Sequence, residues 1–314
     1  MSKNLIIILS LQLLCLHISA QITSEDQKSK KTYETQRIEK APIIDGILND
    51  AAYTHAMEAS NFVMVDPGDG TLIPNEFATS VKIVYDDQAI YIGAHMRSAD
   101  PDKTISQFTQ RDNMEQSEFF LIDLNTYNDG ENQTRFIVTA AGTQADAKMT
   151  GNNEDYNYNV VWESAISNDE TGWYAEIKIP YSALRFPKKE EQLWSMQLAR
   201  KISHLNQTYV WSYINKSLGK NSQYNGLLMG LKNIDPPVRL SFYPYTSAEV
   251  DNYNGTTQSS FNAGLDIKYG ISDAFTLDAT LIPDFGQTAY DNVELNLGPF
   301  EQTFGENRAF FTEG

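Results

Sequence analysis

The sequence predicts an all-β protein: an antiparallel, jelly-roll-like β-sandwich followed by the first strands of an incomplete β-barrel. The first observation is the stretch 172–187, where Trp173, Ala175, Ile177 and Ile179 alternate with more polar residues, as in a strand that buries one face. The second is a series of roughly ten short strand-like runs bounded by Asp, Asn, Gly and Pro, a pattern typical of β-sandwiches. The third is that helical periodicity is almost absent, apart from a turn near residues 50–57.

Residues 1–20 are predicted to be a secretory signal peptide. Lys3 supplies the positive start, residues 5–16 form a mostly apolar run, and Ser19-Ala20 offers small residues for cleavage. The run is too short to cross a membrane as a helix. We therefore expect export to the outer membrane, the cell surface or the periplasm of a Gram-negative bacterium. The single cysteine, Cys15, lies inside this segment, so the mature chain has no disulfide and no cysteine-based metal site.

Charge narrows the choice of partners. The chain has 314 residues and a formal net charge of −17. A surface this acidic repels phosphate backbones, so nucleic acid is not an expected partner. Residues 21–40 are polar and charged without periodicity, and we predict that they form a flexible leader.

The sandwich is predicted to occupy residues 41–235. Its candidate strands are short runs with alternating or continuous apolar residues. They are 81–85 and 90–96 around a hairpin turn, then 119–124, 135–140, 143–147, 160–163, 173–179, 194–200, 208–213 and 227–231.

A change of pattern follows the double proline Pro236-Pro237, so residues 236–314 are predicted to be a second domain. Segments 238–246, 261–269 and 275–281 are apolar on one side and polar on the other, as in transmembrane β-strands. A closed barrel of this kind needs about eight strands or more. We therefore interpret this part as the truncated start of a barrel in a longer protein, with a second soluble β-domain as the alternative.

Three groups of residues resemble a known family when they are taken together. They are Ile44-Asp45-Gly46 with Asn49 to Tyr53, the hairpin from Val84 to Ala94, and the strand from Trp173 to Pro187. The chain resembles the family 9 carbohydrate-binding-module-like domain that opens a group of Gram-negative outer-membrane surface proteins, where a poorly characterised β-barrel domain follows it. Tyr53 stands where that family's opening motif usually ends in tryptophan.

The resemblance implies a sugar site in which two tryptophans clamp the ring and a carboxylate, an arginine and amides surround it. Glu118 and Arg135 occupy plausible positions for the carboxylate and the arginine, and Arg111 is a further candidate. Candidates for the second aromatic side chain are Trp211, Tyr213 and Tyr224. The loop expected to carry the first tryptophan reads Met114-Glu115-Gln116 instead. The alternatives are that Trp211 belongs to the core and that the two arginines form surface ion pairs.

An oxygen-rich loop suggests a structural calcium ion. Asp123, Asn125, Asp129 and Glu131 are spaced about every second residue around Gly130, and such oxygens suit a hard cation. The spacing does not match an EF-hand, and a solvated turn is the alternative reading.

These observations favour a non-catalytic carbohydrate-binding module, with an oligo- or polysaccharide as its partner and with the outer membrane contacted through the C-terminal part. Its role would be glycan capture or carbohydrate catabolism. The alternatives are a structural or interaction domain that has lost sugar binding, and a glycoside hydrolase. Histidines 55, 95 and 204 fit no zinc spacing, and no nucleophile–base motif is present in the sequence.

Overall fold

The computed structural model describes residues 30–68, 70–215, 219, 221–238, 240–253, 255–271 and 275–281. The predicted signal peptide, residues 21–29 of the predicted leader and the segment from residue 282 onward lie outside the described residues. Among the described residues, no helix is long and apolar enough to cross a membrane.

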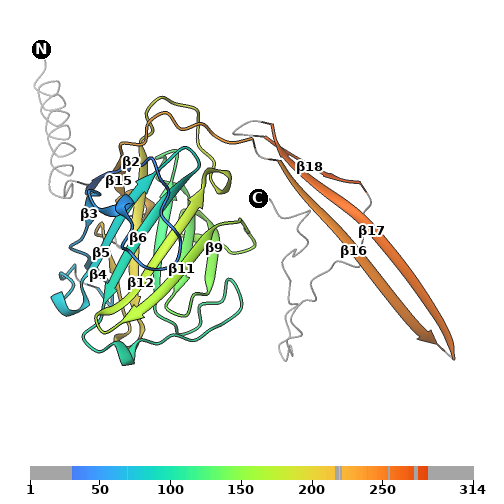
Figure 1. The fold of residues 1–314 in the computed structure, drawn as a ribbon, viewed down its shortest axis with the longest axis horizontal. Coiled ribbons are helices and arrows are strands. Elements are labelled where there is room, and N and C mark those ends of the chain that lie inside the picture. Colours follow the sequence, from blue (N-terminus) through green and yellow to red (C-terminus); the bar gives the residue numbers. More distant parts are fainter. Residues whose placement is uncertain are drawn as a thin grey trace, which may run out of the picture.

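Within the described ranges the fold is all-β, as predicted, and its strands form two stacked sheets and a third, separate sheet (Figure 1). The larger sheet of the sandwich has the order β1-β15-β13-β7-β8-β9-β10, with β14 beside β13 and β4 beside β14. Its strands are β1 (Thr32–Glu34), β4 (Val63–Asp66), β7 (Phe119–Asn125), β8 (Asn132–Thr139), β9 (Gln144–Thr150), β10 (Asn153–Asp155), β13 (Trp194–Ile202), β14 (Gln207–Val210) and β15 (Gly226–Met229).

The second sheet of the sandwich has the order β11-β12-β6-β5-β2, with β3 paired to β5. Its strands are β2 (Gln36–Arg37), β3 (Glu58–Ala59), β5 (Thr79–Tyr85), β6 (Ala89–Arg97), β11 (Glu163–Asp169) and β12 (Gly172–Pro180). Most pairs are antiparallel, but β1–β15 and β2–β5 are parallel.

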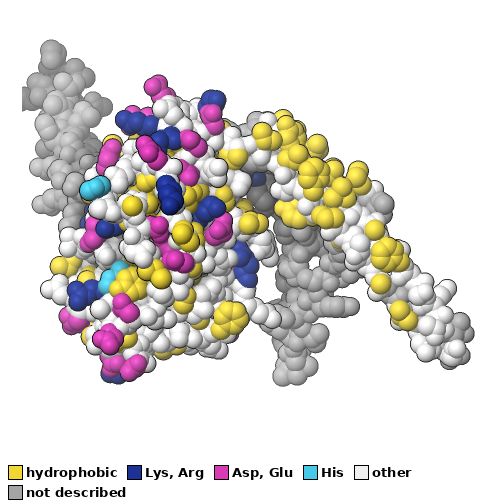
Figure 2. Space-filling model, viewed as in Figure 1, with side chains coloured by type: hydrophobic (Ala, Val, Ile, Leu, Met, Phe, Trp, Pro, Cys, Tyr) yellow, Lys and Arg dark blue, Asp and Glu magenta, His cyan; other side chains and the backbone are white. Residues whose placement is uncertain are grey.

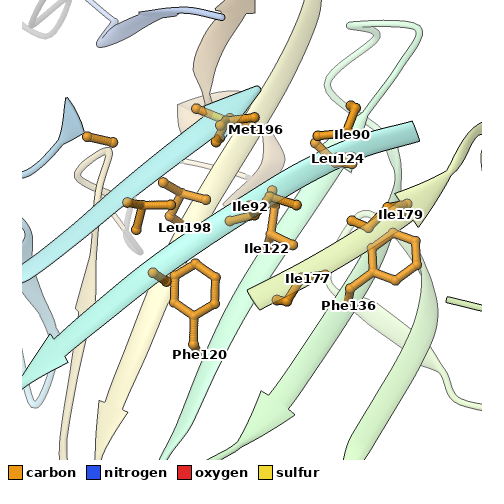
Figure 3. Packing of buried hydrophobic residues seen from close by; sticks show 14 of the residues in the cluster. Ile90, Ile92, Phe120, Ile122, Leu124, Phe136, Ile177, Ile179, Met196 and Leu198 are labelled. Atoms are coloured by element: carbon orange, nitrogen blue, oxygen red, sulfur yellow. The ribbon is translucent and has the colours of Figure 1, made fainter. Parts of the chain in front are cut away.

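The core lies between these two sheets because each strand turns its apolar side inward. Ile90 and Ile92 of β6 and Ile177 and Ile179 of β12 face Phe120, Ile122, Leu124, Phe136, Met196 and Leu198 of the larger sheet (Figure 3). All are at most 1% exposed. Continuous burial of this kind holds the sandwich together without a disulfide.

The predicted flexible leader is wrong for its last residues, because the sandwich begins at Thr32 rather than Ala41. Tyr33 is fully buried, and its hydroxyl donates to the Met57 carbonyl and accepts from the Ile83 backbone N–H at 2.7 Å. A polar stretch with one buried aromatic side chain gives a weak periodic signal, and the pairing partners β15 and β5 are distant in the sequence.

One predicted strand is displaced. Residues 160–163 were expected to be a strand, but β11 starts at Glu163. The preceding residues are held by a side chain instead: the Asp146 carboxylate accepts from the Val160 backbone N–H at 2.9 Å and from Trp162 Nε1 at 3.1 Å.

The third sheet consists of β16 (Leu240–Tyr253), β17 (Thr256–Gly270) and β18 (Thr276–Thr280), in that order. The register places Phe242 opposite Ile267 and Ala248 opposite Phe261, so the apolar side chains share one face. Ser241, Lys268 and Asp278 lie on the other face. The long β16–β17 pair extends away from the sandwich (Figure 1).

Candidate functional site

The outer face of the larger sheet of the sandwich carries a second, smaller apolar cluster. The strand register places Val210, Ala199, Leu121, Ile137 and Ala145 in one row across β14, β13, β7, β8 and β9. All five are buried, and they form the centre of this cluster. The alternation of each strand produces this row, because the neighbouring residues on either side point into the sandwich.

A polar row runs beside the apolar one. Gln197 of β13 is opposite Asp123 of β7, and Asp123 is opposite Arg135 of β8. Arg135 donates from Nε to Asp123 Oδ1 and from Nη2 to Oδ2, each at 2.8 Å, and its Nη1 donates to Glu154. This bidentate geometry fixes the orientation of the guanidinium. Burial alone would lower the pKa of Arg135, but the charges of Asp123 and Glu154 outweigh burial and raise it.

Buried amides extend the polar row. Gln197 donates to the Ser212 carbonyl at 2.7 Å and accepts from the Ser212 N–H at 2.9 Å. Asn225 Nδ2 donates to Gln133 Oε1 at 2.9 Å, and Gln133 lies within 3.4 Å of Asp123 Oδ2. Hydrogen bonds thus connect Asn225, Gln133, Asp123 and Arg135, and Gln197 lies opposite Asp123 in the register. Planar polar groups of this kind are the chemistry that recognises sugar hydroxyls.

Aromatic side chains stand at the margin of this face. Tyr156 and Tyr224 are partly buried and pack against the apolar row, together with Met114 and Phe119. Burial, followed by the hydrogen bond from its hydroxyl to Glu154 at 2.8 Å, raises the pKa of Tyr156 to about 12. Tyr156 therefore stays neutral and can offer its ring to a ligand. We refer to the polar row, the apolar row and these aromatic residues as the outer face.

Glu118 and Arg135, the predicted carboxylate and arginine, do not lie together. Glu118 points into the sandwich, where its Oε2 is 3.5 Å from Arg200 Nη2 and its Oε1 is 3.2 Å from His204 Nδ1. Burial lowers the pKa of Arg200 to about 10, although Glu118 opposes that shift. Asp123 is the carboxylate that contacts Arg135. The sequence held a sign of this, because strand alternation places Asp123 on the same outward side of β7 as the apolar side chains of Phe119 and Leu121.

The other predicted ligand-binding residues are scattered. Trp211 is 3% exposed and belongs to the main core, as its alternative reading held. Tyr213 is exposed, and its ring lies beside Gly70. Tyr224 is on the outer face. Arg111 donates to Asp146, to Gln144 Oε1 at 2.8 Å and to the Val160 carbonyl at 3.0 Å. It therefore attaches the segment before β11 to β9.

The predicted calcium ligands are only partly brought together. Asp129 Oδ1 accepts from Asn125 Nδ2 at 2.9 Å, from Glu131 N at 2.8 Å and from Asn132 N at 3.0 Å. Burial alone would raise the pKa of Asp129, but these hydrogen bonds outweigh burial and lower it. Asp123 is paired with Arg135. Among the described residues, no group of three or more His, Cys, Asp or Glu side chains is arranged to hold a metal ion. A cation here must displace N–H donors, and calcium at this loop stays a prediction.

The motifs that carried the family resemblance meet elsewhere, on the outer side of the second sheet. Glu176 of β12 accepts hydrogen bonds from the backbone of Asp45 and Gly46. Tyr53 lies against Gly93 of β6, where a Cβ would come within 3.2 Å of the tyrosine ring. These residues attach the N-terminal loop to the sheet. The motif residues therefore have a structural role here, and their contacts do not form a ligand site.

Two parts of the chain match known protein families. Residues 44–224 match the profile of the carbohydrate family 9 binding domain-like family, and residues 236–314 match a domain of unknown function (DUF5916). No curated protein matches the sequence. Two solved structures of a family 9 carbohydrate-binding module from Caldicellulosiruptor kristjanssonii are similar. The cellotriose complex has 14% identity and a TM-score of 0.48 over 66% of this chain and 100% of that one. The glucose complex has 13% identity and a TM-score of 0.45 over 66% and 98%.

Proposed function

Because the chain belongs to the carbohydrate family 9 binding domain-like family, we propose that its sandwich is a non-catalytic domain that binds an oligo- or polysaccharide. The proposed binding surface is the outer face of the larger sheet. Its proposed role is to capture glycan at the surface of the Gram-negative bacterium that exports it, as part of carbohydrate catabolism.

The observation that carries this proposal is that the polar row of Gln197, Asp123 and Arg135 runs beside an apolar row against which partly buried tyrosines pack. Sugars present C–H groups to aromatic faces and hydroxyls to amides, carboxylates and guanidinium groups. The bidentate Asp123–Arg135 pair holds both side chains in one orientation before a ligand arrives, which reduces the entropy lost on binding.

Calorimetric titration of the full chain with a panel of oligosaccharides tests the proposal. We expect at least one neutral oligosaccharide to bind, and Tyr224→Ala to weaken its binding about tenfold, since an aromatic contact contributes on the order of 1 kcal/mol beyond its buried area. Tyr174→Ala is the matched control, because Tyr174 is a partly buried tyrosine on β12 of the second sheet. If the folded protein showed no binding to any sugar of the panel, sugar binding would be refuted.

We further propose that the third sheet belongs to an outer-membrane β-barrel. Its support is the apolar face, where Phe242, Val250 and Phe261 are 56%, 70% and 70% exposed. The stretch from Leu240 to Val250 spans roughly 35 Å, and a tilt of about 45° reduces this to about 25 Å, the height of the apolar band of such barrels. Figure 2 shows hydrophobic side chains gathered over the part of this sheet nearest the sandwich, with few at the far tip.

Flotation of the full chain with phospholipid vesicles tests the membrane proposal. We expect the chain to float with the vesicles and the double variant Phe242→Asp/Phe261→Asp to lose this association. Ser260→Asp adds charge to the opposite face, because Ser260 pairs with Glu249 in the register, and it should behave like the original chain. Equal flotation of all three proteins, or of none, would contradict the proposal.

A second candidate function is an interaction domain that has lost sugar binding. It is favoured by one observation: each nitrogen of Arg135 already donates to a carboxylate, and Trp211 is in the core. The same titration separates the two functions, because an interaction domain stays silent toward every sugar while keeping its cooperative unfolding transition.

A further inference from the structure

A small cavity lies where the sandwich meets the third sheet. Its volume is about 170 Å³, and residues from both parts line it. The sandwich contributes Tyr158, Ser182 and Arg185, and the sheet contributes Tyr243, Lys268 and Thr276. Arg185 connects the two parts directly, since its Nη2 lies 3.4 Å from Thr276 Oγ1.

The polar face of the third sheet is the one turned toward the sandwich here. The register places Ser241 opposite Lys268, and Gly270 of the neighbouring strand pairs with Thr276. Ser241, Lys268 and Thr276 all line the cavity. Phe242 and Ile267 point to the other side of the sheet. A ligand in this cavity therefore meets hydroxyl and ammonium groups, beside the apolar side chains of Leu184, Val238 and Leu240.

The charge of the cavity is opposite to that of the whole chain. Asp and Glu outnumber Lys and Arg by 41 to 24 in the sequence, yet none of the described residues that line the cavity is acidic. Arg185 and Lys268 both line it, and Lys148 lies 4.5 Å above the ring of Tyr158. Asp278, 3.6 Å from Lys268 Nζ, is the nearby counter-charge.

We propose that this cavity binds the anionic group, a carboxylate or a phosphate, of a water-soluble acidic sugar. A guanidinium, an ammonium and the hydroxyls of Ser182, Ser241 and Thr276 are the donors that oxyanions accept from. The ring of Tyr243, which is 52% exposed, gives the C–H face of the sugar a surface to pack against. The site is separate from the outer face, so it does not depend on sugar binding there.

Titration of the full chain, kept in detergent because of its apolar sheet, tests this site. The probes are glucuronate, glucose 6-phosphate, inorganic phosphate and neutral glucose. We expect the acidic sugars to bind, raised salt to weaken them, and glucose not to compete with them. A preference for glucuronate or for glucose 6-phosphate identifies the anionic group, and binding of inorganic phosphate alone, without the acidic sugars, would overturn the proposal.

Two variants attribute binding to the cavity. Arg185→Gln/Lys268→Gln should weaken the acidic sugar at least tenfold, and Lys188→Gln is the matched control, since its side chain is 75% exposed and pairs with Asp235 outside the cavity. Ser241→Asp keeps both cations and the Arg185–Thr276 contact but adds a carboxylate, and it should also weaken binding at least tenfold. Unchanged affinity in both cavity variants would overturn the proposal, whatever the outer face binds.

Discussion

The carboxylate of Glu176 accepts a hydrogen bond from the backbone N–H of Gly46 at 2.9 Å, across 130 residues of sequence, and a second one from Asp45 at 3.0 Å. Gly46 has a φ of +85°, and a Cβ there would lie 2.6 Å from the backbone carbon of Ile166. A glycine in this turn and an acidic residue in β12 are therefore parts of one structural contact.

Replacing Glu176 by alanine should destabilise the fold. The substitution leaves one buried and one partly buried N–H group without an acceptor, and we expect a loss of about 3 kcal/mol in the free energy of unfolding. Glu163→Ala is the matched control, because Glu163 is 59% exposed in its pair with Lys178 and should cost at most about 1 kcal/mol. Urea denaturation of both variants measures the difference, and equal losses would contradict the structural role of Glu176.

The same carboxylate should give stability a pH dependence. Burial raises the pKa of Glu176, although the two backbone hydrogen bonds oppose the shift. The folded state then holds a proton that the unfolded state has released, so this contribution is complete below the ordinary value of 4.5 and is lost as pH rises through the folded pKa. Glu176→Gln cannot ionise, so its stability relative to the original chain should increase with pH across this window. Parallel stability profiles for the two proteins would refute this assignment.

The Asp123–Arg135 pair is expected to be strongly coupled. The two side chains are only 4% and 15% exposed. Asp123→Ala leaves a largely buried guanidinium with one remaining carboxylate, so we predict a loss of about 3 kcal/mol. The double variant Asp123→Leu/Arg135→Met should cost less than the sum of its own two single variants, Asp123→Leu and Arg135→Met. Asp235→Ala, in an exposed pair with Lys188, should change stability by at most about 1 kcal/mol. Additive losses in the double-mutant cycle would contradict the coupling.

Strand alternation made most of the sandwich predictable, because a strand with one buried face shows its period in a short window. The inward set of β12, beginning at Trp173, and the two-faced strands of the third sheet follow directly from it. Which strands are neighbours does not follow, since pairing joins distant residues. For that reason the sequence does not show that Glu118 lies beside Arg200 of β13, or that Arg135 lies beside Asp123 of β7.

The Asp129 loop gives a prediction for calcium. An ion bound there must replace the Asn125, Glu131 and Asn132 donors around Asp129. We therefore expect at most weak binding, with a dissociation constant on the order of 1 mM, at the weak end of extracellular calcium sites. Thermal unfolding with millimolar calcium and with a chelator measures it, and Asp129→Asn should abolish any calcium-dependent rise in Tm. A micromolar site would contradict the competition with these donors.

His95 should make the sandwich sensitive to mild acid. Its ring stacks on Tyr174 with centroids 4.1 Å apart, and its Nε2 lies 3.1 Å from Thr171 Oγ1. Burial lowers the pKa of His95 from its ordinary 6.5; Asp169 opposes the shift, and Arg97 and Arg200 add to it.

The unfolded chain therefore binds a proton at a pH where the folded chain does not, and the contribution of His95 is present above 6.5 and lost as pH falls toward the folded pKa. His95→Gln cannot take up that proton, so it should lose less stability between pH 7 and about pH 5 than the original chain does. His55→Gln, at an exposed histidine, is the control and should follow the original profile. If both variants followed the original chain, burial of His95 would not be the source of this acid sensitivity.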